Sequence, residues 1–391
     1  MRRILSYAED HTPGQPSTFQ KRHHYAFTDV GLGQGGFGVV MKATQIKDDT
    51  PVAIKKVPKS VVKDKVAYRR IVSFMIDSSH PNIVRFLEAF ESKHHFYTVY
   101  ELVESKQDLF DRLLDVKHFT ENDAKAAMRS ALSATAYLHD RQVIHRDLKL
   151  ENFMMRSTHS GPGDLVLIDF GTSLVLQDGQ AGGLTEVTGT PGYMAPEIYK
   201  KKGYSYLADI WSLGTVCWML LSGRSLYSTS TDYPVIMRET LALDEAPFPE
   251  QVFHDITDDA KAFIRHLLDP SPSTRASARD ALDHKWLSRQ AMTPKFDTSH
   301  RTPASMESDA HGLLPEKGQP KLEDGATVND AEGSRFAGTA TMPHELLDPH
   351  SAPDSGTNTP KPTDMAKARE KHTGEELMIS SALLERVRTR Q

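Results

Sequence analysis

The chain has 391 residues, of which 38% are hydrophobic and 25% are charged, so it can bury a large core and still leave polar flanks. Its formal net charge of -5 argues against a general nucleic-acid-binding surface. The single cysteine excludes an intrachain disulfide, and the longest apolar run, 213–221, is far shorter than the roughly 20 residues of a membrane span. We expect a cytoplasmic protein, with the nucleus as an alternative, that has neither nucleic-acid nor membrane partners.

The first part of the chain predicts a short leader followed by a small lobe rich in strands. Residues 1–24 are polar and carry two prolines and a glycine, which predicts a disordered leader. From Tyr25 to Val57 short β-rich runs predict three antiparallel strands. A helix over 61–76 and two further strands that run to Tyr100 complete a small lobe, which we place at 25–103.

Helix signals dominate the next part of the chain, which we place in a larger lobe at 104–287. Thr120 is a suitable N-cap for a helix that runs to His139, because acidic residues follow it in the first turn. A second helix is expected from Leu207 to Gly223, and a third begins near Thr257. Together the two lobes predict an α+β fold.

After Leu287 the composition changes to Pro, Ser, Thr, Gly, Asp and His with few large apolar residues. Such a segment cannot bury enough surface to offset its ordering entropy, so residues 288–391 are expected to be a disordered tail. Within it, 375–388 has apolar residues at helical spacing, which predicts a short amphipathic helix. Two interpretations stay open for this helix: a transient helix without a partner, and a docking or autoinhibitory segment.

Two segments of the larger lobe carry the residues that phosphoryl transfer needs. The run 145–152 reads HRDLKLEN and contains a base, a cation and an amide, and 168–171 reads IDFG and adds a carboxylate. Upstream, 33–40 is a glycine-rich loop, and 52–55 reads VAIK. A dinucleotide-binding fold could show the same glycines, but there the loop opens a helix, whereas here a strand follows.

With these motifs in this order, the chain resembles a eukaryotic protein kinase of the serine/threonine type from about Tyr25 to Leu287. Further motifs at 195–197 and 209–214 fit the resemblance. The segments 101–103, 109–112 and 137–139 look most like the calcium/calmodulin-dependent and calcium-dependent kinase group. The tail lacks an EF-hand loop, so direct calcium binding is not expected.

The resemblance implies that the chain uses ATP and Mg²⁺, and it assigns a role to individual residues. Asp147 would be the catalytic base, Lys149 would neutralise the migrating phosphoryl group, and Lys55 would hold the nucleotide phosphates. Asn152 and Asp169 would bind Mg²⁺. The nucleotide-binding residues would be Leu32, Gly33, Gln34, Gly35, Gly36, Phe37, Gly38, Val39, Val40, Ala53, Lys55, Glu101 and Val103.

One position departs from the family pattern. The helix residue that should be a Glu paired with Lys55 is Ile71, and no Glu occurs between Lys55 and Leu87. Without that ion pair Lys55 would be less well oriented. We therefore expect an active serine/threonine kinase and retain two alternatives, a nucleotide-binding pseudokinase and a protein-binding scaffold.

The resemblance also suggests how the enzyme is regulated and what it acts on. Arg146 should pair with an acidic group in the activation segment, where Glu186 occupies the usual phosphate-bearing position. Thr190 should bond the catalytic Asp and Lys. Asp108 and Glu151 match acids that face basic residues upstream of a target Ser or Thr in protein substrates, and the alternative is two solvated acids at a rim. The sequence leaves the oligomeric state open.

Overall fold

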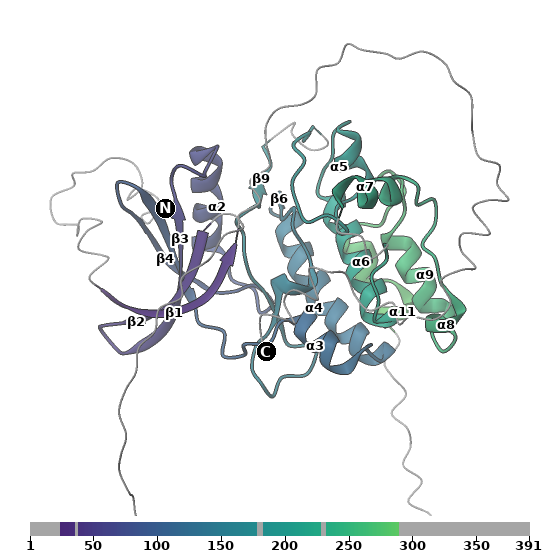
Figure 1. The fold of residues 1–391 in the computed structure, drawn as a ribbon, viewed down its shortest axis with the longest axis horizontal. Coiled ribbons are helices and arrows are strands. Elements are labelled where there is room, and N and C mark those ends of the chain that lie inside the picture. Colours follow the sequence, from purple (N-terminus) through teal and green to yellow (C-terminus); the bar gives the residue numbers. More distant parts are fainter. Residues whose placement is uncertain (1–23, 36–37, 178–182, 228–231, 289–391) are drawn as a thin grey trace, which may run out of the picture. The chain divides into compact units, whose positions relative to one another are not determined.

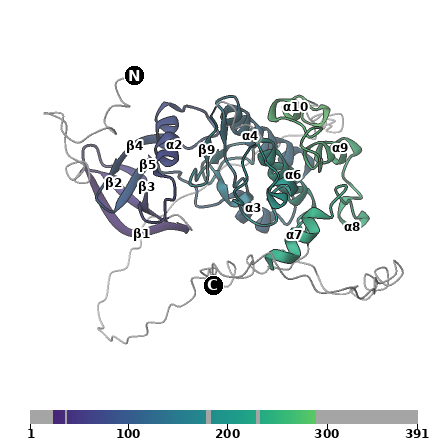
Figure 2. The ribbon, with the colours of Figure 1, turned by 90° about the horizontal axis from the view of Figure 1, so that it is seen from above.

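The computed structural model describes residues 24–35, 38–177, 183–227 and 232–288. Within these ranges the chain forms a small lobe built on a β-sheet and a larger lobe built from helices (Figure 1). The view from above shows the same division (Figure 2). The predicted α+β fold with two lobes is confirmed. Almost all of the predicted leader and tail, including the helix expected over 375–388, lies outside the described residues.

The small lobe is a five-stranded antiparallel sheet in the order β1-β2-β3-β5-β4. Alternate residues of the central strand, Val52 and Ile54, are fully buried, as expected for a strand with one face on a core. The pairing places Lys55 opposite Val40 on one side and Thr98 on the other. The strands are β1 (Tyr25–Gly35), β2 (Gly38–Gln45), β3 (Thr50–Pro58), β4 (Phe86–Glu91) and β5 (His95–Glu101).

Helix α2 (Lys65–Asp77) begins later than the predicted residue 61. The reason is Asp64, whose carboxylate accepts hydrogen bonds from the backbone N–H groups of Val66 and Ala67 at 2.8 and 2.9 Å. This N-cap satisfies two donors that have no partner inside the helix. Asp64 therefore fixes where the helix starts.

The buried face of α2 belongs to the core of the larger lobe. Ile71, Val72 and Met75 join the apolar cluster that contains the large-lobe helices, while the sheet has a separate small cluster. Beyond the helix, the Ser79 backbone N–H donates to the Tyr137 hydroxyl at 3.1 Å. Apolar contact with the larger lobe thus positions this helix.

The larger lobe is built around two helices whose ends were predicted from their caps. Helix α4 follows the N-cap Thr120, and α6 ends at Gly223, which has a left-handed φ of 67°. A Cβ at Gly223 would lie 2.1 Å from the Lys117 carbonyl oxygen, so only glycine fits there. The helices are α3 (Leu109–Val116), α4 (Glu121–His139), α5 (Pro196–Lys200), α6 (Leu207–Ser222), α7 (Tyr233–Leu241), α8 (Glu250–Phe253), α9 (Asp258–Leu267), α10 (Ala278–Leu282) and α11 (Lys285–Ser288).

Short strands next to the helices carry the loops that face the small lobe. β6 (Val143–Ile144) pairs with β9 (Leu174–Val175), and β7 (Phe153–Met155) pairs with β8 (Leu165–Leu167). A 3₁₀ turn over Leu150–Asn152 precedes β7. None of the described helices combines the length and the apolar character that a membrane span needs.

A buried ion pair ties two distant parts of the larger lobe together. Arg275 donates to both carboxylate oxygens of Glu197 at 2.6 and 3.0 Å. The Arg275 side chain is fully buried and also lies over the Trp211 ring, 5.1 Å from its centre. A charged pair this deeply buried needs such two-pronged geometry to offset its desolvation.

Candidate active site

The loop between β6 and the 3₁₀ turn is held by one buried carboxylate from α6. Asp209 is 1% exposed and accepts hydrogen bonds from the backbone N–H groups of His145 and Arg146 at 2.9 and 2.8 Å. His139 bonds the same carboxylate at 2.9 Å. Arg146 has a left-handed φ of 68°, which is costly for a residue with a side chain. The bonds from Asp209 hold this loop in its strained conformation.

Burial alone would raise the pKa of Asp209, but the hydrogen bond from His139 and the bonds from the loop outweigh it and lower the pKa. The carboxylate is therefore ionised at neutral pH, as its role as an acceptor of three hydrogen bonds requires. Sequence reasoning did not name Asp209 as a site residue. The available signal was an acid in the first turn of an otherwise apolar helix.

The predicted catalytic residues of this loop meet around one carboxylate. Lys149 Nζ lies 3.2 Å from Asp147 Oδ2, and Thr190 Oγ1 donates to Asp147 Oδ1 at 2.6 Å. Lys149 also donates to Thr190 Oγ1 at 2.8 Å. Asn152 Nδ2 donates to the backbone oxygen of Asp147 at 2.7 Å, so its amide oxygen points to the other side. The predicted bonds from Thr190 to Asp147 and Lys149 are present.

Lys55 does have a carboxylate partner, although the predicted helix position carries Ile71. Its Nζ lies 2.5 Å from Asp169 Oδ1, and the Lys55 side chain is 11% exposed. The Gly171 backbone N–H donates to the same Asp169 oxygen at 2.9 Å. Burial would raise the pKa of Asp169, but the nearby Lys55 charge and these bonds lower it. Asp169 therefore orients Lys55 in place of the missing helix Glu.

Ile71 itself is 4% exposed and lines the same cavity as Lys55. This cavity has a volume of about 490 Å³ and lies between α2, β3, β5 and the segments that carry Asp147 and Thr190. Tyr100 lies on its wall and contacts Phe86 edge to face at 5.6 Å. The position opposite Lys55 on α2 is thus apolar and packed.

His145 has a packing role. Its ring is fully buried and meets the Phe170 ring edge to face at 5.3 Å. Burial lowers the pKa of His145, although neighbouring acids oppose the shift. A neutral, enclosed imidazole supports the loop and the adjoining segment by contact.

Glu186 pairs with Arg146, as predicted. Arg146 Nη1 lies 3.2 Å from Glu186 Oε2, while Arg146 Nε donates to the Thr172 backbone oxygen at 2.6 Å. Sequence reasoning missed Lys63, just before α2, whose Nζ lies 3.6 Å from Glu186 Oε1. One carboxylate therefore links the catalytic loop with the start of α2.

The segment that carries Glu186 and Thr190 approaches the loop at Gly189. This glycine has a φ of 122°, and a Cβ on it would lie 2.7 Å from the Arg146 backbone oxygen. Any larger residue would push the segment away. The close approach keeps Thr190 within reach of Asp147.

Most of the predicted nucleotide-binding residues lie on strands β1, β2 and β3. Gly33, Gly35 and Gly38 lie where β1 and β2 meet, with Gly35 paired to Gly38, and Gly36 and Phe37 lie outside the described residues. Ala53 pairs with Tyr100 across β3 and β5. The glycine loop, Glu101 and Val103 do not line the 490 Å³ cavity. The remaining members, Leu32, Gln34, Val39 and Val40, belong to β1 and β2.

The Glu101 side chain turns away from any nucleotide role, because it bonds two arginines. Its Oε1 accepts a hydrogen bond from the Arg85 backbone N–H at 3.0 Å and lies 3.5 Å from Arg156 Nη1. Only the backbone of Glu101 is left to contact a ligand. Its side chain therefore stabilises the junction of the lobes.

Two acids lie near the catalytic carboxylate around Tyr193. Burial raises the pKa of Tyr193 well above its ordinary value, and the charges of Glu151, Asp147 and Asp108 add to the shift. Asp108 is 7% exposed and caps α3, because its Oδ1 accepts from the Asp111 N–H at 2.8 Å. Asp108 is thus a buried helix cap, which the reading as a solvated rim residue does not fit.

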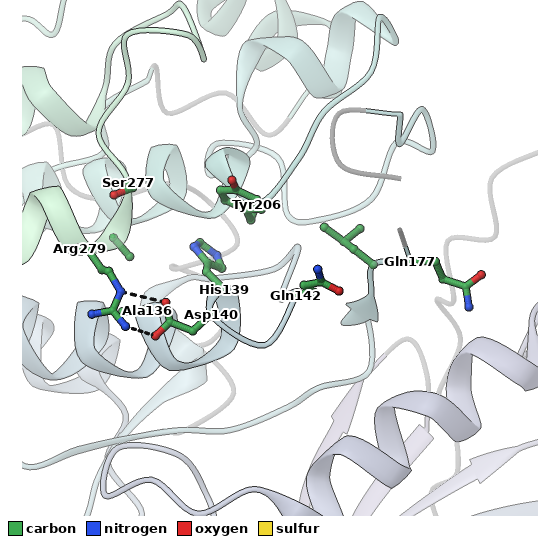
Figure 3. Close-up of a pocket in the computed structure, with 10 residues that line it drawn as sticks. Ala136, His139, Asp140, Gln142, Gln177, Tyr206, Ser277 and Arg279 are labelled. Atoms are coloured by element: carbon green, nitrogen blue, oxygen red, sulfur yellow. Dashed lines mark hydrogen bonds and ion pairs between the residues drawn. The ribbon is translucent and has the colours of Figure 1, made fainter. Parts of the chain in front are cut away.

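A separate cavity of about 450 Å³ lies on the larger lobe, between the end of α4, the start of α6 and α10 (Figure 3). The catalytic residues do not line it. Its wall includes His139, which also contacts Asp209 and the Tyr206 ring, and an exposed ion pair between Arg279 and Asp140.

Comparison with known proteins identifies the fold family. A family model described as a protein kinase domain matches residues 28–287, more than half of the chain. The chain belongs to the protein kinase family. The resemblance inferred from its motifs is confirmed.

The curated relatives of this chain include calcium/calmodulin-dependent protein kinases. A calcium/calmodulin-dependent protein kinase of Metarhizium anisopliae is 40% identical over 285 residues, which cover 72% of this chain and 72% of that protein. The calcium/calmodulin-dependent protein kinase type I of Schizosaccharomyces pombe is 36% identical over 266 residues, 66% of this chain and 77% of that protein. The human type 1B enzyme is 36% identical over 262 residues, 66% of this chain and 73% of that protein.

Proposed function

We propose that this kinase transfers the γ-phosphoryl group of ATP to a serine or threonine hydroxyl of a protein, with Asp147 as the base. The observation that carries the proposal is the bonding of Asp147. Thr190 and Lys149 hold its two carboxylate oxygens at 2.6 and 3.2 Å, and Asn152 holds its backbone. A base fixed in this way can accept the proton of a bound hydroxyl without first reorganising.

The neighbouring cations would offset the charge on the transferred group. Lys149 lies beside the base, where an ammonium can stabilise negative charge as the phosphoryl group moves. Lys55, held by Asp169, projects into the same cavity and would contact the nucleotide phosphates. Both cations come from rigid surroundings, which favours catalysis by preorganisation.

Asn152 and Asp169 would hold Mg²⁺. The described residues contain no group of three or more His, Cys, Asp or Glu suited to a metal. An amide oxygen and a carboxylate nevertheless fit Mg²⁺, which takes few protein ligands and completes its shell with phosphates and water. When bound, the ion would neutralise part of the phosphate charge.

The acids around Tyr193 support a preference for basic residues upstream of the target hydroxyl. Asp108 forms a backbone bridge with Met154, close after Glu151 in the chain, so the two acids occupy one region of the larger lobe. Glu151 Oε2 is buried and has no hydrogen-bond partner among the described residues. Two carboxylates in one region would favour a positively charged substrate side chain by charge complementarity.

The alternative of a nucleotide-binding pseudokinase rests on Ile71. The structure weakens this alternative, because Lys55 is oriented by Asp169 and the other residues of the site are in place. A scaffold that does not bind nucleotide would not require the hydrogen bonds that link Thr190 with Asp147 and Lys149.

The test uses the full chain, Mg²⁺, ATP and a serine peptide with arginines at the first and third positions before the serine. We expect phosphorylation that falls about 100- to 10,000-fold in Asp147→Asn. Turnover by the unaltered chain no greater than that of Asp147→Asn would establish a pseudokinase. Thermal unfolding with and without ATP distinguishes a scaffold from a nucleotide-binding protein, because ATP would not raise the unfolding midpoint of a scaffold.

A further inference from the structure

We propose that the exposed surface around the start of α2 binds a second copy of this chain, through the acidic segment that contains α7 and α8. The two surfaces carry opposite charge and belong to different lobes. The contact is therefore head to tail, with the small lobe of one molecule against the larger lobe of the next. This proposal concerns assembly and does not depend on the proposed phosphoryl transfer.

The surface around the start of α2 is strongly basic. The segment 59–70 has five Lys or Arg residues and one acid, Asp64, so its formal net charge is +4 in a chain whose total is -5. The turn between β4 and β5 lies alongside, because the Lys59 backbone N–H donates to the His94 backbone oxygen at 2.8 Å. That turn adds a further lysine. The α2 basic surface thus consists of Lys59, Lys63, Lys65, Arg69, Arg70 and Lys93.

Acids of the same molecule neutralise only part of this positive charge. Glu91 lies 2.8 Å from Lys59 and 3.3 Å from Arg69. Lys65 and Lys93 are exposed, and neither has an ion pair within the described ranges of the chain. The first turn of α2 contains no acid, and lysines at the start of a helix oppose its dipole. The positive charge therefore does not serve the stability of the helix and is available to a partner.

The segment 239–259 of the larger lobe has the complementary charge. It contains seven Asp or Glu residues and no Lys or Arg, a formal net charge of -7. Two of these acids have cationic partners outside the segment, and the pairs are Glu245 with Arg265 and Asp259 with Lys285. Asp244 and Glu250 are exposed and have no ion pair in the part of the chain that the structure describes. This segment is the acidic surface of the larger lobe.

Exposed apolar side chains lie within both charged surfaces. Val66 is 56% exposed, and Arg69 and Arg70 follow it at the spacing that shares one side of a helix. Val61 is 43% exposed just before α2, and Leu241 is 39% exposed at the end of α7. Only six large apolar residues are exposed among the residues that the structure describes, and these are three of them. An apolar centre with a charged rim is typical of a protein interface.

The two surfaces lie apart within one molecule. Both views show α2 on the small lobe and α8 at the end of the larger lobe that is remote from it (Figure 1, Figure 2). A contact between two different surfaces is heterologous, so each bound molecule keeps one free surface of each kind. Further copies can then add, and the association grows with protein concentration.

An anionic membrane matches the charge but not the shape or the apolar residues. Amphipathic helices that lie on membranes insert Trp, Phe or Leu, whereas the exposed apolar residues of the α2 basic surface are valines. Lys63 and Val61 also line the 490 Å³ cavity, so this surface turns inward at the cleft between the lobes. A folded protein segment with a raised acidic surface suits such a shape better than a flat bilayer.

Sedimentation velocity of the full chain tests the association directly. We expect the weight-average sedimentation coefficient to rise with protein concentration in about 10 mM salt, where charges interact over about 30 Å. The rise should disappear in about 1 M salt, where that length is about 3 Å. A chain that stays monomeric at low salt overturns the proposal. Binding of such a monomer to phosphatidylserine vesicles would show that the basic surface serves a membrane instead.

Charge reversal tests the basic surface. Lys65→Glu combined with Lys93→Glu should weaken the association at least about tenfold, because like charges then face each other. The matched control combines Lys47→Glu with Lys202→Glu, which changes the net charge equally at exposed sites outside both surfaces. The control should change the association less than about twofold. Equal weakening by the control would show an effect of net charge alone and would overturn the assignment.

Mixing two variants tests whether the contact is head to tail. Asp244→Lys combined with Glu250→Lys should also abolish association, yet this variant keeps an intact basic surface. The variant with Lys65→Glu and Lys93→Glu keeps an intact acidic surface, so an equimolar mixture should associate although neither variant does alone. A mixture that stays monomeric overturns the proposal. Thermal unfolding shows whether each variant is folded, and the single changes Lys65→Glu and Asp244→Lys replace a pair that is not.

Discussion

The catalytic loop and helix α2 face the same cleft, but different forces hold them. Buried polar bonds fix the loop, with Asp209 accepting three hydrogen bonds and Thr190 bridging Asp147 and Lys149. Helix α2 is held mainly by apolar packing through Ile71, together with polar contacts such as the ion pair of Arg69 with Glu91 at 3.3 Å. Directional bonds in a buried setting define one geometry, whereas apolar packing tolerates small shifts. The half of the site on the larger lobe is therefore the more rigidly formed.

The largest expected effect concerns the buried ion pair of the larger lobe. Arg275→Ala leaves Glu197 charged and buried without its partner, which should lower the free energy of unfolding by about 3–5 kcal/mol. Arg279→Ala is the matched control, because its ion pair with Asp140 is exposed. Urea unfolding followed by circular dichroism measures both. Similar losses in the two variants would contradict the importance of burial.

The second prediction concerns the bridge over Asp147. Thr190→Val keeps the shape of the side chain but removes the hydroxyl that bonds Asp147 and Lys149. Hydrogen bonds to charged groups contribute about 1.5–3 kcal/mol, so kcat/KM should fall about 10- to 100-fold. Thr188→Val, in the same segment, should change it less than about twofold. Peptide phosphorylation gives the rates. An unchanged rate in Thr190→Val would show that the Thr190 hydroxyl does not contribute to catalysis.

The third prediction concerns acid pH. Burial lowers the pKa of His145 below the ordinary value of 6.5, so the unfolded chain binds more protons as the pH falls through that value. The contribution of His145 to stability is therefore complete above pH 6.5 and declines below it. The total loss in the free energy of unfolding is about 1.4 kcal/mol for each pKa unit by which folding lowers the pKa of His145. The pKa of Asp209 is also lowered, but its contribution is lost only below about 3.8. Urea unfolding between pH 7.5 and 5 should show a slope that His145→Phe reduces, and an equal slope in His145→Phe would contradict the assignment.

The smallest effect is expected at the exposed link to α2. Lys63 is 92% exposed, so Lys63→Ala should change kcat/KM less than about threefold. Glu186→Gln should cost more, because Arg146 also loses its charged partner. Comparative peptide kinetics would sharpen the contrast between the two halves of the site. A loss of kcat/KM in Lys63→Ala as large as that in Thr190→Val would contradict the contrast between the two halves of the site.

Local signals in the sequence predicted those parts of the fold that depend on local chemistry. The caps Thr120 and Gly223 marked the ends of α4 and α6, because a cap acts within a few residues. Asp64 caps α2, so that the helix starts later than the predicted residue 61, and it does not serve as the carboxylate partner of Lys55. A carboxylate near a helix start can play either role, and only the observed bonds distinguish them.

The site itself was predictable where a motif keeps its residues close together in the chain. The arrangement of Asp147, Lys149 and Asn152 follows from one short loop. The pairing of Lys55 with Asp169 joins residues 114 positions apart, and neither local pattern nor composition reveals it. Loss of the helix Glu therefore predicted a poorly oriented Lys55, while the fold supplied another carboxylate.

The single thiol of the chain gives a direct way to observe how the larger lobe opens. Cys217 is fully buried in α6, one of the most enclosed helices of the lobe, and burial raises its pKa. A thiol reagent can reach it only when that helix becomes exposed to solvent. Because no other cysteine competes for the reagent, the labelling rate of the unmodified protein would report the opening of its innermost helix without any engineered probe.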